Sequence, residues 1–121
     1  MGQRLCLIVD DEPAIRTYLR DVLQRGQIQS IEAESPAKAL QLLQELGTQI
    51  NLIITDIQMP GDMDGVDLAY SVRNAAPRLP VILISAYADN KEIPPSFPFL
   101  QKPFDSKAIL EAVSRAIADL N

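Results

Sequence analysis

The sequence predicts a single α/β domain spanning residues 1–121, in which a parallel sheet is covered by helices on both faces. Two observations lead to this prediction. Short apolar runs rich in β-branched residues alternate along the chain with longer segments whose apolar residues recur at helical spacing. This alternation is typical of parallel strands joined by right-handed helical crossovers. The length of 121 residues allows one hydrophobic core but not two.

Five short segments are predicted as strands, at residues 5–9, 28–33, 51–56, 81–85 and 99–101. The first is a continuous apolar run, and the second carries a weaker signal. The third contains the apolar run 52–54 and passes directly into a turn rich in Asp, Gly and Pro. That pattern favours a buried strand whose carboxyl end opens into a loop, where ligands bind in open α/β sheets.

Four segments are predicted as helices, over residues 13–25, 36–46 and 66–76 and from residue 106 onward. A proline at the first position and a glycine just beyond the end frame each of the first two helices. The predicted cap residues are Ser35 for the second helix, Asp11 or Glu12 for the first, and Asp105 or Ser106 for the last.

The unusual segment is 89–98, between the fourth and fifth strands. A crossover helix belongs there, but Pro94, Pro95 and Pro98 leave room for about one helical turn at most. We therefore expect the helix between these strands to be short or missing.

Composition excludes several classes of protein. The 11 basic residues are scattered and outnumbered by 16 acidic ones, so a nucleic-acid-binding surface is not expected. No apolar run approaches about 20 residues, and the N-terminus lacks the features of a signal peptide, so we expect a cytoplasmic protein without membrane insertion. The single cysteine, Cys6, is expected to be a small apolar strand residue.

The absence of histidine narrows the chemistry. Ser-His-Asp and Cys-His nucleophile pairs are excluded, as are metal sites that need histidine. A reaction in this chain must use carboxylates, hydroxyls, lysines and a metal.

Polar side chains stand at four of the predicted strand ends: Asp10 with Asp11, Asp56, Ser85 and Lys102. Because all carboxyl ends of a parallel sheet lie on one edge, these residues converge. Three carboxylates at about 4 Å separation would repel by roughly 4 kcal/mol per pair at an effective dielectric constant near 20. The group must therefore bind a cation or hold a proton. Oxygen ligands alone favour a hard cation, magnesium before calcium.

Each of these residues alone has an ordinary explanation, such as a helix cap, a turn aspartate or a solvated lysine. Together they supply an exposed carboxylate, a metal site, a hydroxyl on Ser85 and a compact positive charge on Lys102 beside them. Those are the parts needed to make and stabilise an aspartyl phosphate.

Four stretches now carry a family resemblance: LIVDDE, IITDIQMP with MDG, ILISAYAD and FLQKPF. In this order and at these intervals they resemble the response-regulator receiver domains of bacterial two-component signalling, over nearly the whole chain. The resemblance implies a flavodoxin-like, doubly wound, five-stranded parallel sheet with strand order 2-1-3-4-5. It also implies a phosphorelay switch that catalyses only its own phosphorylation and dephosphorylation, and not an enzyme in the usual sense.

The resemblance implies that Asp56 is the phosphoacceptor, which takes a phosphoryl group from a histidine kinase or a histidine phosphotransfer protein. Because this chain has no histidine, that donor must be another protein. Magnesium would be ligated by Asp11, Asp56 and the backbone carbonyl of Gln58, with Asp10 acting through water.

The resemblance also assigns the residues that read the phosphoryl group. Lys102 would pair with the phosphoryl oxygens, and its bond to Pro103 would be cis. Ser85 would move inward to bond the phosphoryl group, and Phe99 would rotate behind it. This coupling turns a local charge into a changed output surface for a partner that the sequence does not identify.

The chain departs from the common receiver pattern in three places. MPGDMDG has one residue more than usual between Pro60 and Asp64. The resemblance implies that Gln58 and Tyr87 occupy positions that in the family tune dephosphorylation, where the bulk of Tyr87 would shield the acyl phosphate. The broken fourth helix removes part of the surface through which many receivers signal or dimerise, so homodimerisation stays open.

Two alternative functions are a magnesium phosphatase and a protein-binding module. A magnesium phosphatase with an aspartate nucleophile needs a D-x-D signature on its first strand, and here Asp10 is followed by Asp11 and Glu12. A receiver-like protein-binding module that is not phosphorylated stays open because of the altered fourth helix. We expect the chain to act alone or as a piece of a larger regulator or hybrid kinase.

Overall fold

The computed structural model describes residues 4–86 and 93–118, so Tyr87 and the rest of segment 87–92 lie outside the described ranges. Five parallel strands form one sheet in the order β2-β1-β3-β4-β5. The strands are β1 (Arg4–Val9), β2 (Ile28–Ala33), β3 (Leu52–Asp56), β4 (Val81–Ser85) and β5 (Phe99–Gln101). This confirms the predicted strand order and fold.

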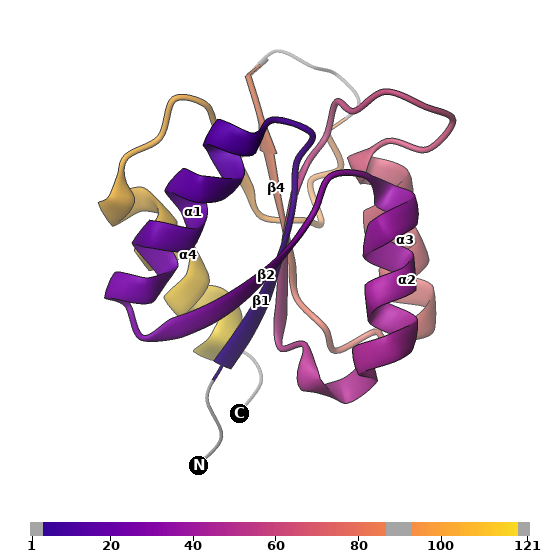
Figure 1. Cartoon of the computed structure of the whole chain (residues 1–121), viewed down its shortest axis with the longest axis horizontal. Helices are drawn as coiled ribbons and strands as arrows, with labels where there is room; N and C mark the ends of the chain where they lie inside the picture. Colours follow the sequence, from indigo (N-terminus) through magenta and orange to yellow (C-terminus); the bar gives the residue numbers. More distant parts are fainter. Residues whose placement is uncertain (1–3, 87–92, 119–121) are drawn as a thin grey trace.

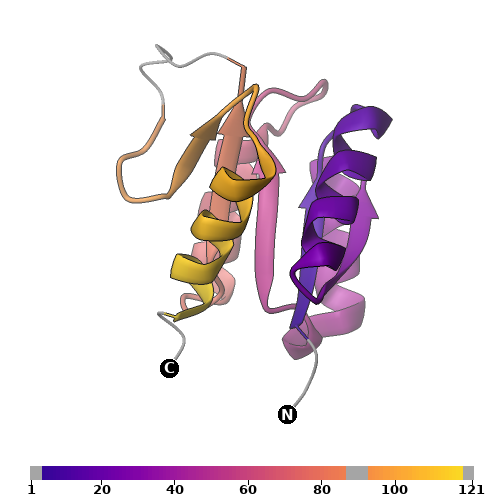
Figure 2. The same cartoon turned by 90° about the vertical axis from the view of Figure 1, so that its left-hand side faces the viewer.

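Helices cover the sheet on both faces. Within the described ranges they are α1 (Pro13–Arg25), α2 (Pro36–Leu46), α3 (Gly65–Ala75) and α4 (Ser106–Ala118), with a short 3₁₀ turn η1 (Gly47–Gln49) after α2. In Figure 1, α1 and α4 lie on one side of the sheet and α2 and α3 on the other. Figure 2 looks onto the side that carries α1 and α4.

Two hydrophobic clusters, one on each face of the sheet, form the core. Successive strand residues point to opposite faces, so Leu7, Ile53 and Leu83 pack with α2 and α3. Their strand neighbours pack with α1 and α4, and fully buried Cys6 lies in that cluster. All five residues of β3 and of β4 are buried, as expected for central strands covered on both faces.

The starts of the helices agree with the prediction except in two places. The Oγ of Ser35 accepts the backbone N–H of Lys38 at 3.1 Å, and an Asp105 oxygen accepts the N–H of Ala108 at 2.8 Å. For α1 the prediction of a side-chain cap was wrong, because Glu12 occupies the cap position without such a bond. Its carboxylate lies near Lys102 instead.

The third helix begins at Gly65, one residue earlier than predicted. Asp64 and Asp67 form a capping box, in which each side chain accepts the backbone N–H of the other residue, at 2.9 and 3.1 Å. These bonds satisfy two backbone groups at the helix start and hold its first turn in place.

Residues 93–98 form turns with no helix among them, and they are held against α3. The ring of Phe97 is buried, and the Arg73 guanidinium lies 3.7 Å from its centroid. The same guanidinium donates to the Oγ of Ser96 at 2.9 Å and to its carbonyl at 3.1 Å. Tyr70 meets the Phe97 ring edge-on at 5.4 Å. The proline-rich segment is therefore fastened to α3 by aromatic and arginine contacts.

Arg73→Ala is expected to lower the free energy of unfolding by about 1 to 2 kcal/mol, because it removes two hydrogen bonds and a cation–π contact. Arg115→Ala, on the exposed side of α4, is the control and should change it by about 0.5 kcal/mol or less. Urea denaturation of the two variants measures both. Equal effects would show that the fastening of segment 93–98 contributes nothing to stability.

Candidate functional site

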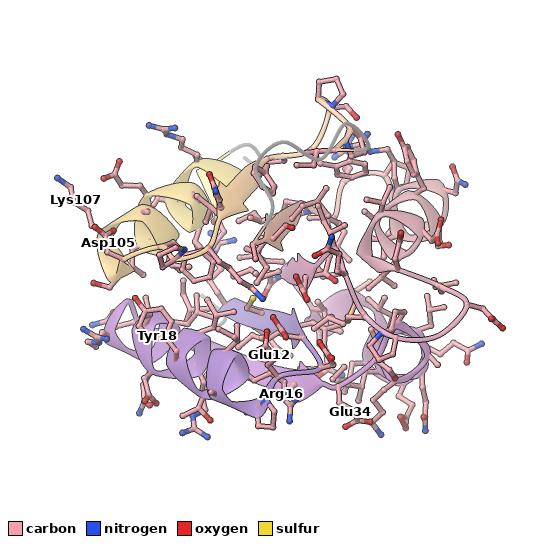
Figure 3. The ribbon with its side chains drawn as sticks, turned by 90° about the horizontal axis from the view of Figure 1, so that it is seen from above. Glu12, Arg16, Tyr18, Glu34, Asp105 and Lys107 are labelled. Atoms are coloured by element: carbon pink, nitrogen blue, oxygen red, sulfur yellow. The ribbon has the colours of Figure 1, made fainter. Side chains whose placement is uncertain are left out.

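Three carboxylates meet at the carboxyl edge of the sheet. β1 and β3 are neighbours, with Val9 opposite Thr55, so the residues that follow come together. One oxygen from each of Asp10, Asp11 and Asp56 lies within 4.8 Å of the others. Asp10 and Asp56 are buried and Asp11 is exposed. Figure 3 looks down onto this edge of the molecule. The topology thus brings together the acidic residues predicted to converge.

Lys102 joins these carboxylates from the end of β5. Its Nζ lies 3.2 Å from Asp10, 3.4 Å from Glu12 and 3.5 Å from Asp56. The Lys102 N–H donates to the carbonyl of Ser85 at 2.7 Å, and the Lys102–Pro103 peptide bond is cis. The lysine is therefore held by its backbone as well as by its charge.

Burial and neighbouring charges shift the pKa values of Asp10, Asp56 and Lys102. Burial, followed by the nearby Asp10 carboxylate, raises the pKa of Asp56 to about 6. Burial also raises the pKa of Asp10, although the Glu12 N–H and Lys102 oppose this shift. Burial lowers the pKa of Lys102, but the Asp56 and Asp10 carboxylates outweigh that effect and the net shift is upward. One lysine therefore does not compensate the clustered negative charge.

The residues fit a hard divalent cation. The three clustered ligand groups are all carboxylates, and magnesium prefers such oxygens. Burial, the largest cause of the raised pKa values of Asp10 and Asp56, disfavours their ionised forms, and a bound cation would stabilise those ionised forms. The donor chemistry and the charge both suit Mg²⁺.

The remaining predicted site residues lie around this centre. Ser85 is fully buried at the end of β4, next to β3, where Asp56 pairs with Ile84. Phe99 is half-buried at the start of β5 and packs on the cluster shared with α2 and α3. Gln58 is exposed at the beginning of the loop that follows β3.

Gly65 packs directly under Asp56. A Cβ built on Gly65 would overlap the Asp56 carbonyl oxygen and lie 2.8 Å from the Cα of Ile57. The Gly65 N–H donates to the Ile57 carbonyl at 2.8 Å. The start of α3 thus rests on the backbone that carries Asp56, and only glycine leaves room for this contact.

Sequence reasoning missed two polar residues of the site, Glu12 and Arg16. Glu12 contacts Lys102, and Arg16 donates to the carbonyl of Asp10 at 2.7 Å. The signal for Glu12 was a third acid directly after Asp10 and Asp11. Arg16 gave no comparable signal, because an arginine on an amphipathic helix is usually solvated.

A second contact joins α1 to the loop after Lys102. The hydroxyl of Tyr18 donates to the carbonyl of Phe104 at 3.3 Å, and the two rings stack with centroids 6.2 Å apart. This contact ties the lysine-bearing loop to the helix that follows Asp10 and Asp11.

Comparisons with known proteins agree with this geometry. The family model described as "Response regulator receiver domain" matches residues 6–114. The chain is 32% identical to "Sensor kinase CckA" of Brucella abortus over 96% of its length, and 35% identical to "Response regulator protein FleR" of Pseudomonas aeruginosa over 90%. It spans 13% and 24% of these two relatives, respectively.

Solved structures show the same fold. A response regulator receiver protein from Sinorhizobium medicae aligns with a TM-score of 0.89 at 27% identity, covering 99% of this chain and 98% of that one. The receiver domain of the hybrid histidine kinase CckA aligns with a TM-score of 0.80 at 32% identity, over 93% of this chain and 98% of that one. Within the described ranges, no helix is both long and apolar enough to cross a bilayer.

Proposed function

The chain belongs to the response-regulator receiver domains, and on that premise we propose that Asp56 accepts a phosphoryl group from a phosphohistidine of a partner protein. The observation that carries this proposal is the position of Asp56. Its carboxylate is buried at the tip of β3, 3.5 Å from the Lys102 ammonium and clustered with Asp10 and Asp11. A nucleophile, a cationic group for phosphoryl oxygens and an acidic cation site thus adjoin one another.

In the proposed reaction, an ionised Asp56 oxygen attacks the phosphorus of the donor. An O–P bond forms, the N–P bond breaks, and its electron pair returns to the imidazole nitrogen of the donor. With a pKa raised by burial to about 6, Asp56 is mostly ionised at pH 7. Lys102 lies close enough to Asp56 to bind the phosphoryl oxygens once these replace its contact with the Asp56 carboxylate.

We propose that Asp10, Asp11 and Asp56, with the backbone carbonyl of Gln58, hold Mg²⁺. When bound, the cation supplies positive charge that offsets the carboxylates and the oxygens of the arriving phosphoryl group. Asp10 is already paired with Lys102 at 3.2 Å and accepts the Glu12 N–H at 2.9 Å, which favours its action through water.

The proposed readout runs through Ser85 and Phe99. Ser85 is buried beside β3, and its carbonyl accepts the N–H of Lys102, so its backbone is linked to the phosphate-facing lysine. We propose that its hydroxyl bonds the phosphoryl group and that Phe99 rotates behind it. Because Phe99 packs in the cluster with α3 and Phe97, such a rotation would reach the segment fastened by Arg73.

The proposal extends to cellular context. The donor would be a histidine kinase or a histidine phosphotransfer protein in the cytoplasm, and the output would pass to a further protein or domain. We propose that residues 1–121 act as one receiver domain, whose own chemistry is limited to its phosphorylation and dephosphorylation.

The test is intact-mass measurement after incubation with acetyl phosphate, with and without Mg²⁺. The wild-type chain should gain the mass of one phosphoryl group only with Mg²⁺, and Asp56→Asn should gain none. Asp62→Asn is the matched control, because Asp62 is exposed on the loop after β3 and should leave the gain intact. A gain that persists in Asp56→Asn would refute the assignment of Asp56. The absence of any gain, with histidine kinase donors also supplied, would refute the switch function.

A further inference from the structure

Arg16 reaches from the first turns of α1 back to the end of β1. Its Nη1 donates to the backbone carbonyl of Asp10 at 2.7 Å, and its Nε donates to Glu32 at 3.1 Å. The side chain is only 17% exposed, so both bonds form in a partly desolvated setting. Figure 3 shows Arg16 and Glu12 near the same end of α1.

The carbonyl that Arg16 holds belongs to the peptide between the two adjacent candidate ligands. Because that peptide is planar, the direction of the Asp10 carbonyl fixes the direction in which the chain continues to Asp11. The other groups of Asp10 are also held: its N–H donates to the Ala33 carbonyl at 3.1 Å, and its carboxylate accepts the Glu12 N–H at 2.9 Å. The bond from Arg16 holds the third polar group of Asp10, its backbone carbonyl.

Glu32 explains why an arginine serves this purpose. Two donors of one rigid, planar guanidinium meet two acceptors, the Asp10 carbonyl and the Glu32 carboxylate, and this fixes the plane of the group. We call this pair of bonds, from Nε to Glu32 and from Nη1 to the Asp10 carbonyl, the fork of Arg16. A lysine offers its donors from a single nitrogen and cannot reproduce the fork. Glu32 lies on β2, so the contact also ties α1 and the end of β1 to the edge strand of the sheet.

From this geometry we infer that Arg16, oriented by Glu32, is a positioning residue that sets the Asp10–Asp11 turn for divalent-cation binding. The inference rests on the proposed function of the site. The described contacts of Arg16 are with Glu32 and the Asp10 carbonyl and not with the clustered carboxylates, so it would act through the peptide that joins Asp10 to Asp11.

The direct measurement is the dissociation constant for Mg²⁺, obtained by isothermal titration calorimetry of the whole chain. Arg16→Ala should weaken Mg²⁺ binding about tenfold, since loss of an outer partner of metal ligands commonly costs 10- to 100-fold. In phosphorylation by acetyl phosphate, the Mg²⁺ concentration for half-maximal rate should rise by the same factor. The rate at saturating Mg²⁺ should stay close to that of the wild type.

Arg20→Ala is the matched control. Arg20 lies on the same helix and its guanidinium is 3.9 Å from Glu32, but the described contacts of Arg20 do not include Asp10. We expect its Mg²⁺ affinity to equal that of the wild type. Arg16→Lys keeps the charge without the fork and should resemble Arg16→Ala, whereas Glu32→Gln keeps an acceptor oxygen and should weaken binding less.

Thermal unfolding without Mg²⁺ separates positioning from general stability, and all titrations are made where every variant is folded. If Arg16→Ala does not fold, Arg16→Lys and Glu32→Gln provide the same comparison. Wild-type Mg²⁺ affinity in folded Arg16→Ala or Arg16→Lys would overturn the inference and leave the proposed function intact. A wild-type chain that binds no Mg²⁺ would overturn the proposed cation site itself, and the inference with it.

Discussion

Replacing Gly65 with alanine is expected to lower the free energy of unfolding by about 3 kcal/mol or more, which is at the upper end of overpacking effects. The added methyl group would overlap the carbonyl oxygen of Asp56 and crowd the Cα of Ile57. These are backbone atoms of Asp56, the last residue of buried β3, and of Ile57, which follows it. Rotation of a side chain therefore cannot relieve the clash. Either α3 must withdraw or Asp56 must move.

The same substitution should therefore impair the chemistry as well as the fold. In a Gly65→Ala chain that stays folded, displacement of Asp56 from Lys102 and the other carboxylates should slow phosphorylation by acetyl phosphate. Gly61→Ala is the control: it adds the same methyl group in the preceding loop, where nothing lies within 4 Å. Its φ of 109° makes alanine strained there, at a cost of about 1 to 3 kcal/mol. Urea denaturation and intact mass measure the two effects. Wild-type phosphorylation by Gly65→Ala would contradict this prediction.

A second large effect is expected from Asp56→Asn on the pH dependence of stability. Because burial raises the pKa of Asp56 from 3.8 to about 6, the folded chain binds more protons than the unfolded chain between these pH values. The free energy of unfolding should therefore fall as pH rises from about 4 to about 6, and stay low above that. Each pKa unit corresponds to about 1.4 kcal/mol, so this carboxylate accounts for about 3 kcal/mol in total.

Asparagine does not ionise, so the Asp56→Asn chain should lack this fall. At pH 7, without divalent cations, it should be more stable than the wild type by about 3 kcal/mol, because the pKa of about 6 already includes the attraction between Lys102 and the ionised carboxylate. The difference should fall below about 1 kcal/mol near pH 4, where the folded carboxyl is protonated and the unfolded one is only partly ionised. Asp10 also has a raised pKa, and its carboxylate contributes to the raised pKa of Asp56, so the comparison measures the response of this coupled pair.

The measurement is urea denaturation of both chains at pH 4 and pH 7, with exposed Asp62→Asn as control. Added Mg²⁺ should reduce the difference at pH 7, since it would stabilise most the chain that retains all three carboxylates. A stability difference that is the same at both pH values would show that ionisation of Asp56 does not oppose folding.

Much of the fold could be predicted because its signals are local. The observed bounds of β2, β4 and β5 equal the predicted ones, since each run is framed by turn-forming residues. Ser35 and Pro36 marked the start of α2, and the Ser35 side chain does cap it. The start of α3 was placed one residue late because its signal was a reciprocal pair of bonds between Asp64 and Asp67.

Local signals were insufficient where contacts join distant residues. Prolines excluded a full helix in segment 89–98, but nothing local indicated that Arg73, more than 20 positions earlier, would hold Ser96 and Phe97. The missing side-chain capping bond of Glu12 has the same origin. Its carboxylate contacts a lysine 90 positions away, and that partner exists only once β5 has joined the sheet.

The candidate site divides in the same way. From the sequence alone, the polar residues at the strand ends predicted that Asp10, Asp11, Asp56 and Lys102 meet, because all carboxyl ends of a parallel sheet share one edge. Only the tertiary structure decided how they are held, through the fork of Arg16 on the Asp10 carbonyl and the contact of Gly65 with the Asp56 backbone. Periodicity and strand ends are properties of neighbouring residues, whereas a hydrogen bond to a carbonyl or a backbone contact depends on how packed elements meet in space.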